Sequence, residues 1–72
     1  MNDQWFNHII RRLIDNANDI LEDEKTHPDD KFVQGEKFAY YLVLDSIKND
    51  LITMEYDLGE CGLDIDLDEK YM

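Results

Sequence analysis

The sequence of 72 residues predicts an all-α fold: an antiparallel two-helix hairpin followed by a short acidic C-terminal tail. Two observations predict this fold. Apolar residues recur with helical spacing over two long stretches, and the single proline, Pro28, stands between them. A chain of this length buries only about 60% of the surface that its unfolded form exposes, so a lone hairpin has a marginal core. We therefore expect the hairpin to dimerise into a four-helix bundle.

The first helix is expected from about residue 3 to residue 25. Its apolar residues lie three or four positions apart, which places them on one face of a helix. They are Phe6, Ile9, Ile10, Leu13, Ile14, Ala17, Ile20 and Leu21. Neither glycine nor proline interrupts this stretch, and polar residues fill the opposite face, so the pattern predicts an amphipathic helix.

The second helix is expected from about residue 30 to residue 58, after a turn at residues 26–30. Pro28 predicts the turn because it disfavours helical geometry at the residue before it. A heptad-type apolar seam runs through the second helix, and Gly59 follows it as a stop signal. The seam consists of Val33, Tyr40, Leu44, Ile47, Leu51, Met54 and Leu58, and Lys37 interrupts it.

The second helix also carries an apolar set that a single neighbouring helix is too narrow to cover. Its members are Phe32, Gly35, Phe38, Ala39, Tyr41, Leu42, Val43 and Ser46. Contiguous apolar surface on a soluble protein usually marks an association site. Gly35 and Ala39 would allow another backbone to approach closely, which favours a homodimer about a two-fold axis. A helix donated by a dedicated partner protein is the competing interpretation.

The charge is strongly negative and unevenly distributed. Eighteen acidic and seven basic residues give a net charge of −11, and residues 55–72 alone carry seven acids and one base, a net −6. Such a balance argues against direct binding to nucleic acid or to an anionic membrane, because both require many Lys and Arg side chains. It favours attraction to a basic protein partner.

The tail, residues 59–72, alternates apolar and acidic residues from Leu63 to Asp68. Its carboxylates resemble the start of a calcium loop, but Glu69 stands where such a loop requires glycine, so we reject this interpretation. Three interpretations stay open: a weakly ordered solubilising tail, a segment that docks on a partner, and a strand folded back on the helices. The candidate acidic contacts in the tail are Asp64, Asp66, Asp68 and Glu69.

The remaining residues give little sign of catalysis. His8 and His27 lack a second ligand at a metal-binding spacing, and Cys61 has acidic neighbours that disfavour its thiolate. We expect no catalytic, cofactor-binding or metal-binding residues, and no enzyme activity. No apolar stretch approaches the ~18 residues of a membrane span, and the N-terminal residues do not resemble a signal peptide, so we expect a cytoplasmic protein.

The sequence therefore predicts a small, acidic, non-enzymatic protein-interaction module that self-associates and presents an acidic surface to a protein partner. The alternative is a nucleic-acid mimic from a phage or mobile element, which would occupy the basic channel of a restriction or CRISPR nuclease. That analogy rests on size and charge. Salt separates the two hypotheses, because binding by a mimic falls steeply with ionic strength whereas apolar docking does not.

Overall fold

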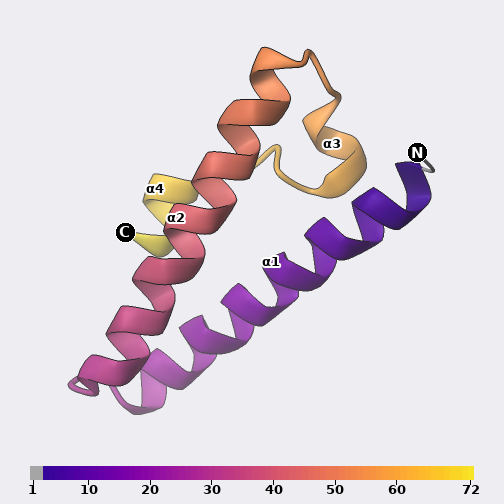
Figure 1. Cartoon of the computed structure of the whole chain (residues 1–72). Coiled ribbons are helices and arrows are strands. Elements are labelled where there is room, and N and C mark those ends of the chain that lie inside the picture. The colour runs from indigo at the N-terminus through magenta and orange to yellow at the C-terminus, as the bar shows by residue number, and fades with distance from the viewer. Residues whose placement is uncertain (1–2) are drawn as a thin grey trace.

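The computed structural model describes residues 3–72, and this part of the chain contains four helices and no strand. Helix α1 spans Asp3–Thr26 and helix α2 spans Lys31–Thr53. The short helices α3 (Leu58–Cys61) and α4 (Leu67–Tyr71) follow. Figure 1 shows α1 and α2 joined at a tight turn and diverging from it, with α3 at the wide end and α4 beside α2. The predicted all-α fold, with two long helices packed together, is confirmed.

The start of α2 follows from a capping residue directly after the turn. Asp30 has an extended backbone, and its carboxylate accepts hydrogen bonds from the backbone N–H groups of Phe32, at 2.9 Å, and Val33, at 3.3 Å. Those N–H groups have no partner within the helix, so the side chain replaces the missing carbonyls. The turn and its cap therefore fix the point at which the chain reverses.

Helix α2 ends at Thr53 and not near Leu58, where the heptad seam placed its end. The cause is Glu55, whose φ of 58° is left-handed. The backbone N–H of Tyr56 then donates to the carbonyl of Leu51 at 2.9 Å, the bond that closes a Schellman motif. A tight helix end therefore forms without a glycine at the left-handed position.

This early end turns Tyr56 back toward α1. Its hydroxyl donates to Asn7 Oδ1 at 2.7 Å, and its ring meets the ring of Phe6 edge-on, with centroids 5.6 Å apart. The edge-to-face geometry is one that aromatic pairs prefer. Met54, which the seam placed in the core, is instead 70% exposed.

The tail packs on its own hairpin. Leu63 and Leu67 are buried and Ile65 is half-buried, whereas Asp64 and Asp66 are exposed. The apolar–acidic alternation therefore does separate inward from outward residues, but it does so in a loop and the helix α4 rather than in a strand. The core cluster consists of Ile10, Ile14, Ala17, Leu44, Leu51, Cys61, Leu63, Leu67 and Tyr71.

Polar contacts hold the tail in place. The Arg11 guanidinium donates to the carbonyls of Glu60, at 2.9 Å, and Gly59, at 3.3 Å. The Lys48 ammonium donates to the carbonyl of Ile65. These bonds occupy carbonyls that neither helix nor strand satisfies, which accounts for an ordered path through an acidic segment.

Two further features concern the long helices. Lys37, which interrupts the apolar seam, pairs with Glu24 of α1 at 2.8 Å, so the exception in the pattern becomes an ion pair between α1 and α2. Among the helices described in residues 3–72, none combines the length and the apolar character needed to cross a membrane.

Candidate interaction surfaces

The association face predicted on α2 is exposed, with one exception. Phe32, Phe38, Leu42 and Val43 range from 47% to 75% exposed. Gly35, Ala39 and Ser46 are exposed too, whereas Tyr41 is half-buried. The structure divides this set between two sides of α2, because adjacent helical residues such as Leu42 and Val43 point about 100° apart.

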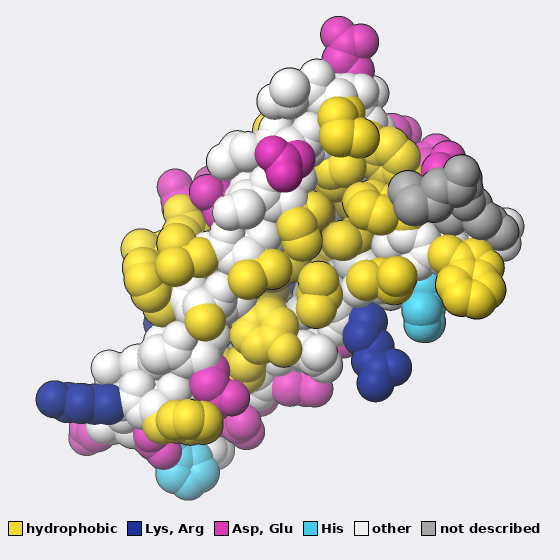
Figure 2. Space-filling model, in the orientation of Figure 1, with side chains coloured by type: hydrophobic (Ala, Val, Ile, Leu, Met, Phe, Trp, Pro, Cys, Tyr) yellow, Lys and Arg dark blue, Asp and Glu magenta, His cyan; other side chains and the backbone are white. Residues whose placement is uncertain are grey.

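One side belongs to a longer apolar surface, which we call the α1/α2 strip. It runs along the open side of the hairpin and consists of Trp5, Phe6, Ile9, Leu13, Tyr40, Val43, Ile47, Met54 and Tyr56. Figure 2 shows hydrophobic side chains gathered between α1 and α2 on this face, with charged side chains mainly at the edges of the surface.

One hollow joins the α1 and α2 parts of the α1/α2 strip. Phe6, Ile47 and Met54 line one open hollow of about 260 Å³, which joins the two long helices. Trp5 and Ile9 line a second hollow at the N-terminal part of α1. On α2, Val43, Ile47 and Met54 recur with helical spacing on one side.

Several residues of the α1/α2 strip are much more exposed than residues in the core of a hairpin should be. Trp5 is 73% exposed and Ile9 is 54% exposed. The tail does not cover them, because Arg11, which binds α3, points from the opposite side of α1 to Ile9. Sequence reasoning assigned Ile9 and Met54 to the internal stripe and seam. The available signal was that the apolar arc of α1 is wider than one facing helix can cover.

The other side of α2 meets the tail, in what we call the α2/α4 surface. The hydroxyl of Tyr41 donates to the carboxylate of Asp68, and the Tyr41 ring stacks on Phe38 with centroids 6.3 Å apart and planes 19° apart. Leu42 lies next to this pair and is 48% exposed. Residues of the predicted apolar face and of the predicted acidic tail, far apart in sequence, thus form one surface.

An open hollow of about 230 Å³ lies beside this aromatic pair. It is lined by Asp45, Lys48, Asn49, Asp66, Leu67 and Asp68. The pKa of Tyr41 is raised to about 12, first because its hydroxyl donates a hydrogen bond to the Asp68 carboxylate, and then by burial and by the charges of Asp68, Asp45 and Asp66. Tyr41 is therefore a protonated donor at neutral pH, and carboxylates dominate the hollow.

The acidic tail residues differ in what they do. Asp66 caps α4 by accepting a hydrogen bond from the backbone N–H of Glu69 at 3.1 Å, and Asp68 accepts from Tyr41. Asp64 and the side chain of Glu69 are exposed. Within residues 3–72, no group of three or more His, Cys, Asp or Glu side chains is arranged to hold a metal ion.

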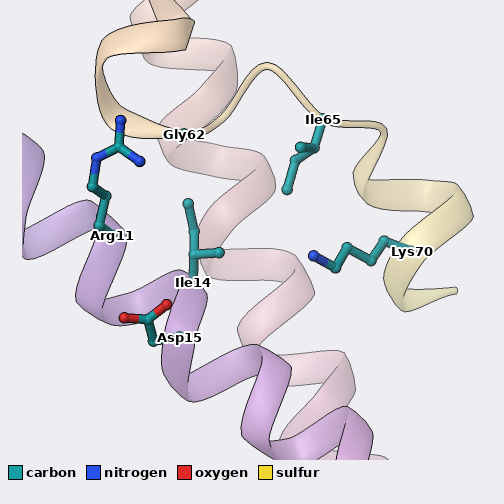
Figure 3. Close-up of a pocket in the computed structure, with 6 residues that line it drawn as sticks. All are labelled: Arg11, Ile14, Asp15, Gly62, Ile65 and Lys70. Atoms are coloured by element: carbon teal, nitrogen blue, oxygen red, sulfur yellow. The ribbon is translucent and has the colours of Figure 1, made fainter.

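A further hollow, of about 300 Å³, lies where α1 meets the tail. Figure 3 shows Arg11 directed toward the Gly62 segment and Lys70 reaching across from α4 toward Ile14 and Ile65. The Arg11 guanidinium is engaged by two carbonyls of α3. This hollow lies at the interface where the tail packs on α1.

No protein-family model matches this chain, and comparison with curated proteins and with solved structures gave no match.

Proposed function

We propose that this protein is a small, acidic, non-enzymatic interaction module that self-associates as a homodimer and presents an acidic surface to a protein partner. The observation that carries the proposal is the α1/α2 strip, a long apolar surface that no segment of residues 3–72 covers. Apolar surfaces of this extent on a soluble protein usually mark association sites.

Pairing of two strips would complete a four-helix bundle, in which each copy supplies two helices. A standard interface buries ~800 Å² of each partner, and the described chain extends over 40 × 20 × 15 Å, so a stable dimer must use most of the open side of the hairpin. Burying a side chain such as Trp5 or Met54 contributes about 1.5–3 kcal/mol, which several residues must supply together to offset the cost of association.

The charge distribution is compatible with this arrangement. Residues 55–72 carry the net −6; of these, α3 packs on the side of α1 that carries Arg11, away from Ile9, and α4 packs on α2. Two copies joined through their strips would therefore keep these segments apart and turn them outward. The outward acidic surface would attract a basic partner.

The test is the molar mass in solution, measured by size-exclusion chromatography with light scattering over a concentration series. We expect twice 8.6 kDa for the full chain. Val43 and Leu42 are a matched pair, because they are adjacent and are 47% and 48% exposed but lie on different sides of α2. Val43→Glu should give a monomer, and Leu42→Glu should leave the dimer intact.

Circular dichroism should show the same helix content in both variants. A wild type that is monomeric at every concentration would contradict self-association. A dimer that survives Val43→Glu and dissociates with Leu42→Glu would instead place the interface on the other side of α2. The nucleic-acid mimic rests on size and net charge alone, and no particular arrangement of the described acids favours it.

A further inference from the structure

The α2/α4 surface combines three features that no other described surface combines. It has an exposed apolar side chain, Leu42, next to the stacked rings of Phe38 and Tyr41. It has the open hollow of about 230 Å³ beside them. The rim of that hollow carries the carboxylates of Asp45 and Asp68 together with that of Asp66.

The acidic rim is only partly neutralised from within, because three carboxylates and one cation line the hollow. Lys48, the cation in the lining, donates to the carbonyl of Ile65 and forms no ion pair with the three carboxylates. Asp68 accepts one hydrogen bond from Tyr41, and a carboxylate has two oxygens and about four acceptor positions. The hydrogen bond therefore fixes the Asp68 carboxylate while leaving it able to accept further donors.

We propose that the α2/α4 surface binds a basic segment of a partner protein, with an arginine or lysine entering the acidic hollow and a neighbouring apolar residue packing on Phe38 and Leu42. Charge complementarity selects this occupant. A second copy is disfavoured, because it would bring another acid-rich α2/α4 surface, or another segment of net −6, against these carboxylates. The inference rests on the proposed function in that it names the site and the partner chemistry for the outward acidic surface.

The experiment titrates the full, isotopically labelled chain with a synthetic amphipathic peptide of about 14 residues, in which leucines lie three or four positions apart on one helical face and arginines fill the other face. Binding is followed by backbone amide chemical shifts. We expect the shifts to change along residues 38–49 and 66–69. A second peptide with every arginine replaced by glutamate should not bind.

Two matched pairs of variants separate this site from general electrostatic attraction. Asp45→Asn should weaken peptide binding about tenfold, whereas Asp19→Asn, which removes the same charge from the exposed face of α1, should leave the affinity unchanged. Phe38→Ala should also weaken binding, whereas Phe32→Ala, also on α2 and exposed, should not.

Equal losses with Asp19→Asn and Asp45→Asn would overturn the proposal, because they would show diffuse attraction to net charge. Shifts confined to the α1/α2 strip, or no binding of the arginine peptide, would also overturn it. Light scattering on the same samples keeps the two proposals distinguishable. A dimer that ignores the peptide refutes only this inference, and a monomer that binds it at the α2/α4 surface refutes only self-association.

Discussion

The hydroxyl of Tyr41 donates a hydrogen bond to the carboxylate of Asp68, and this bond joins the middle of α2 to the last helix of the chain. Asp68 lies directly after Leu67, which is buried in the core. The bond therefore has two consequences. It helps to anchor α4, and it places a tyrosine proton between two elements that are distant in sequence.

Stability should fall as the pH rises from about 10 to about 12. The pKa of Tyr41 is raised to about 12 from the ordinary 10.0, chiefly because its hydroxyl donates to the Asp68 carboxylate. Above pH 10 the unfolded chain loses this proton while the folded chain keeps it. The stabilisation that Tyr41 contributes is therefore fully present below the pKa of Tyr41 in the unfolded chain, and it is lost as the pH rises through the pKa of Tyr41 in the folded chain. Urea unfolding across this range measures the decline.

Tyr41→Phe should reduce the alkaline decline without abolishing it. Burial also raises the pKa values of Tyr56 and Tyr71, which therefore contribute to the same decline. The matched control is Tyr40→Phe, which removes a hydroxyl that contacts the side-chain amide of Asn16 rather than a carboxylate. An identical pH profile for Tyr41→Phe and the wild type would show that the bond to Asp68 does not persist in solution.

Removing the Tyr71 side chain should destabilise the whole fold and not the tail alone. Tyr71 is 1% exposed, and its hydroxyl donates to Asn18 Oδ1 at 2.7 Å. Tyr71→Ala should lower the free energy of unfolding by about 3 kcal/mol or more, as for other large aromatic residues in cores. Tyr71→Phe should cost about 1 kcal/mol, because only the hydrogen bond is lost.

Met72→Ala is the control for Tyr71, since Met72 is 68% exposed and should change the stability by less than about 0.5 kcal/mol. Chemical denaturation monitored by circular dichroism measures all three variants. If Tyr71→Ala behaved like Met72→Ala, the tail would be undocked in solution.

Periodicity was enough to predict the two long helices, because each forms from local contacts. The spacing of Ile10, Ile14 and Ala17 on α1 defines the face that is buried, and Leu44 and Leu51 do so on α2. The turn was equally local, since Pro28 and the capping residue Asp30 lie two positions apart in sequence.

Neither the docking of the tail nor the end of α2 is local. Leu63, Leu67 and Tyr71 are buried only because α1 and α2 supply their neighbours, so the alternation of apolar and acidic residues was compatible with a strand or a free tail as well. Helix α2 ends at Thr53, two residues before the left-handed Glu55, and a glutamate gives no glycine signal for a helix end.

The candidate surfaces show the same difference between features that local sequence determines and features that depend on distant segments. The exposure of Phe38 and Leu42 follows from their positions opposite the seam of α2, and sequence reasoning included both. It did not place Trp5 or Met54 on an exposed strip, because their exposure depends on which side of the hairpin the tail covers.

Gly35→Ala should stabilise the protein by up to about 1 kcal/mol, since glycine is a poor helix former and α2 is helical at this position. A Cβ at residue 35 would meet no atom within 4 Å. The variant should also keep the dimer, because Gly35 lies outside the α1/α2 strip. Denaturation and light scattering measure the two effects. A loss of dimer would favour the original interpretation, in which Gly35 admits another backbone.

Substitutions at the two left-handed positions, one to glycine and one from glycine, should change the stability of the protein in opposite directions. Glu55 has a φ of 58°, a conformation that costs a residue with a Cβ about 1–2 kcal/mol, so Glu55→Gly should stabilise the protein by ~1 kcal/mol. Gly62 has a φ of 88°, and a Cβ there would also lie 3.4 Å from both Arg11 Nη1 and Ile14 Cδ1. Gly62→Ala should therefore destabilise the protein by at least ~1 kcal/mol.

Glu55→Ala separates the backbone effect from the loss of a charge. It removes the same carboxylate as Glu55→Gly but keeps a Cβ, so it should leave the free energy of unfolding within about 0.5 kcal/mol of the wild type. Urea titrations of the three variants at neutral pH give the comparison. Equal stabilisation by alanine and glycine would mean that relief of repulsion among the acids of residues 55–72 dominates, and that the left-handed turn after α2 carries no strain.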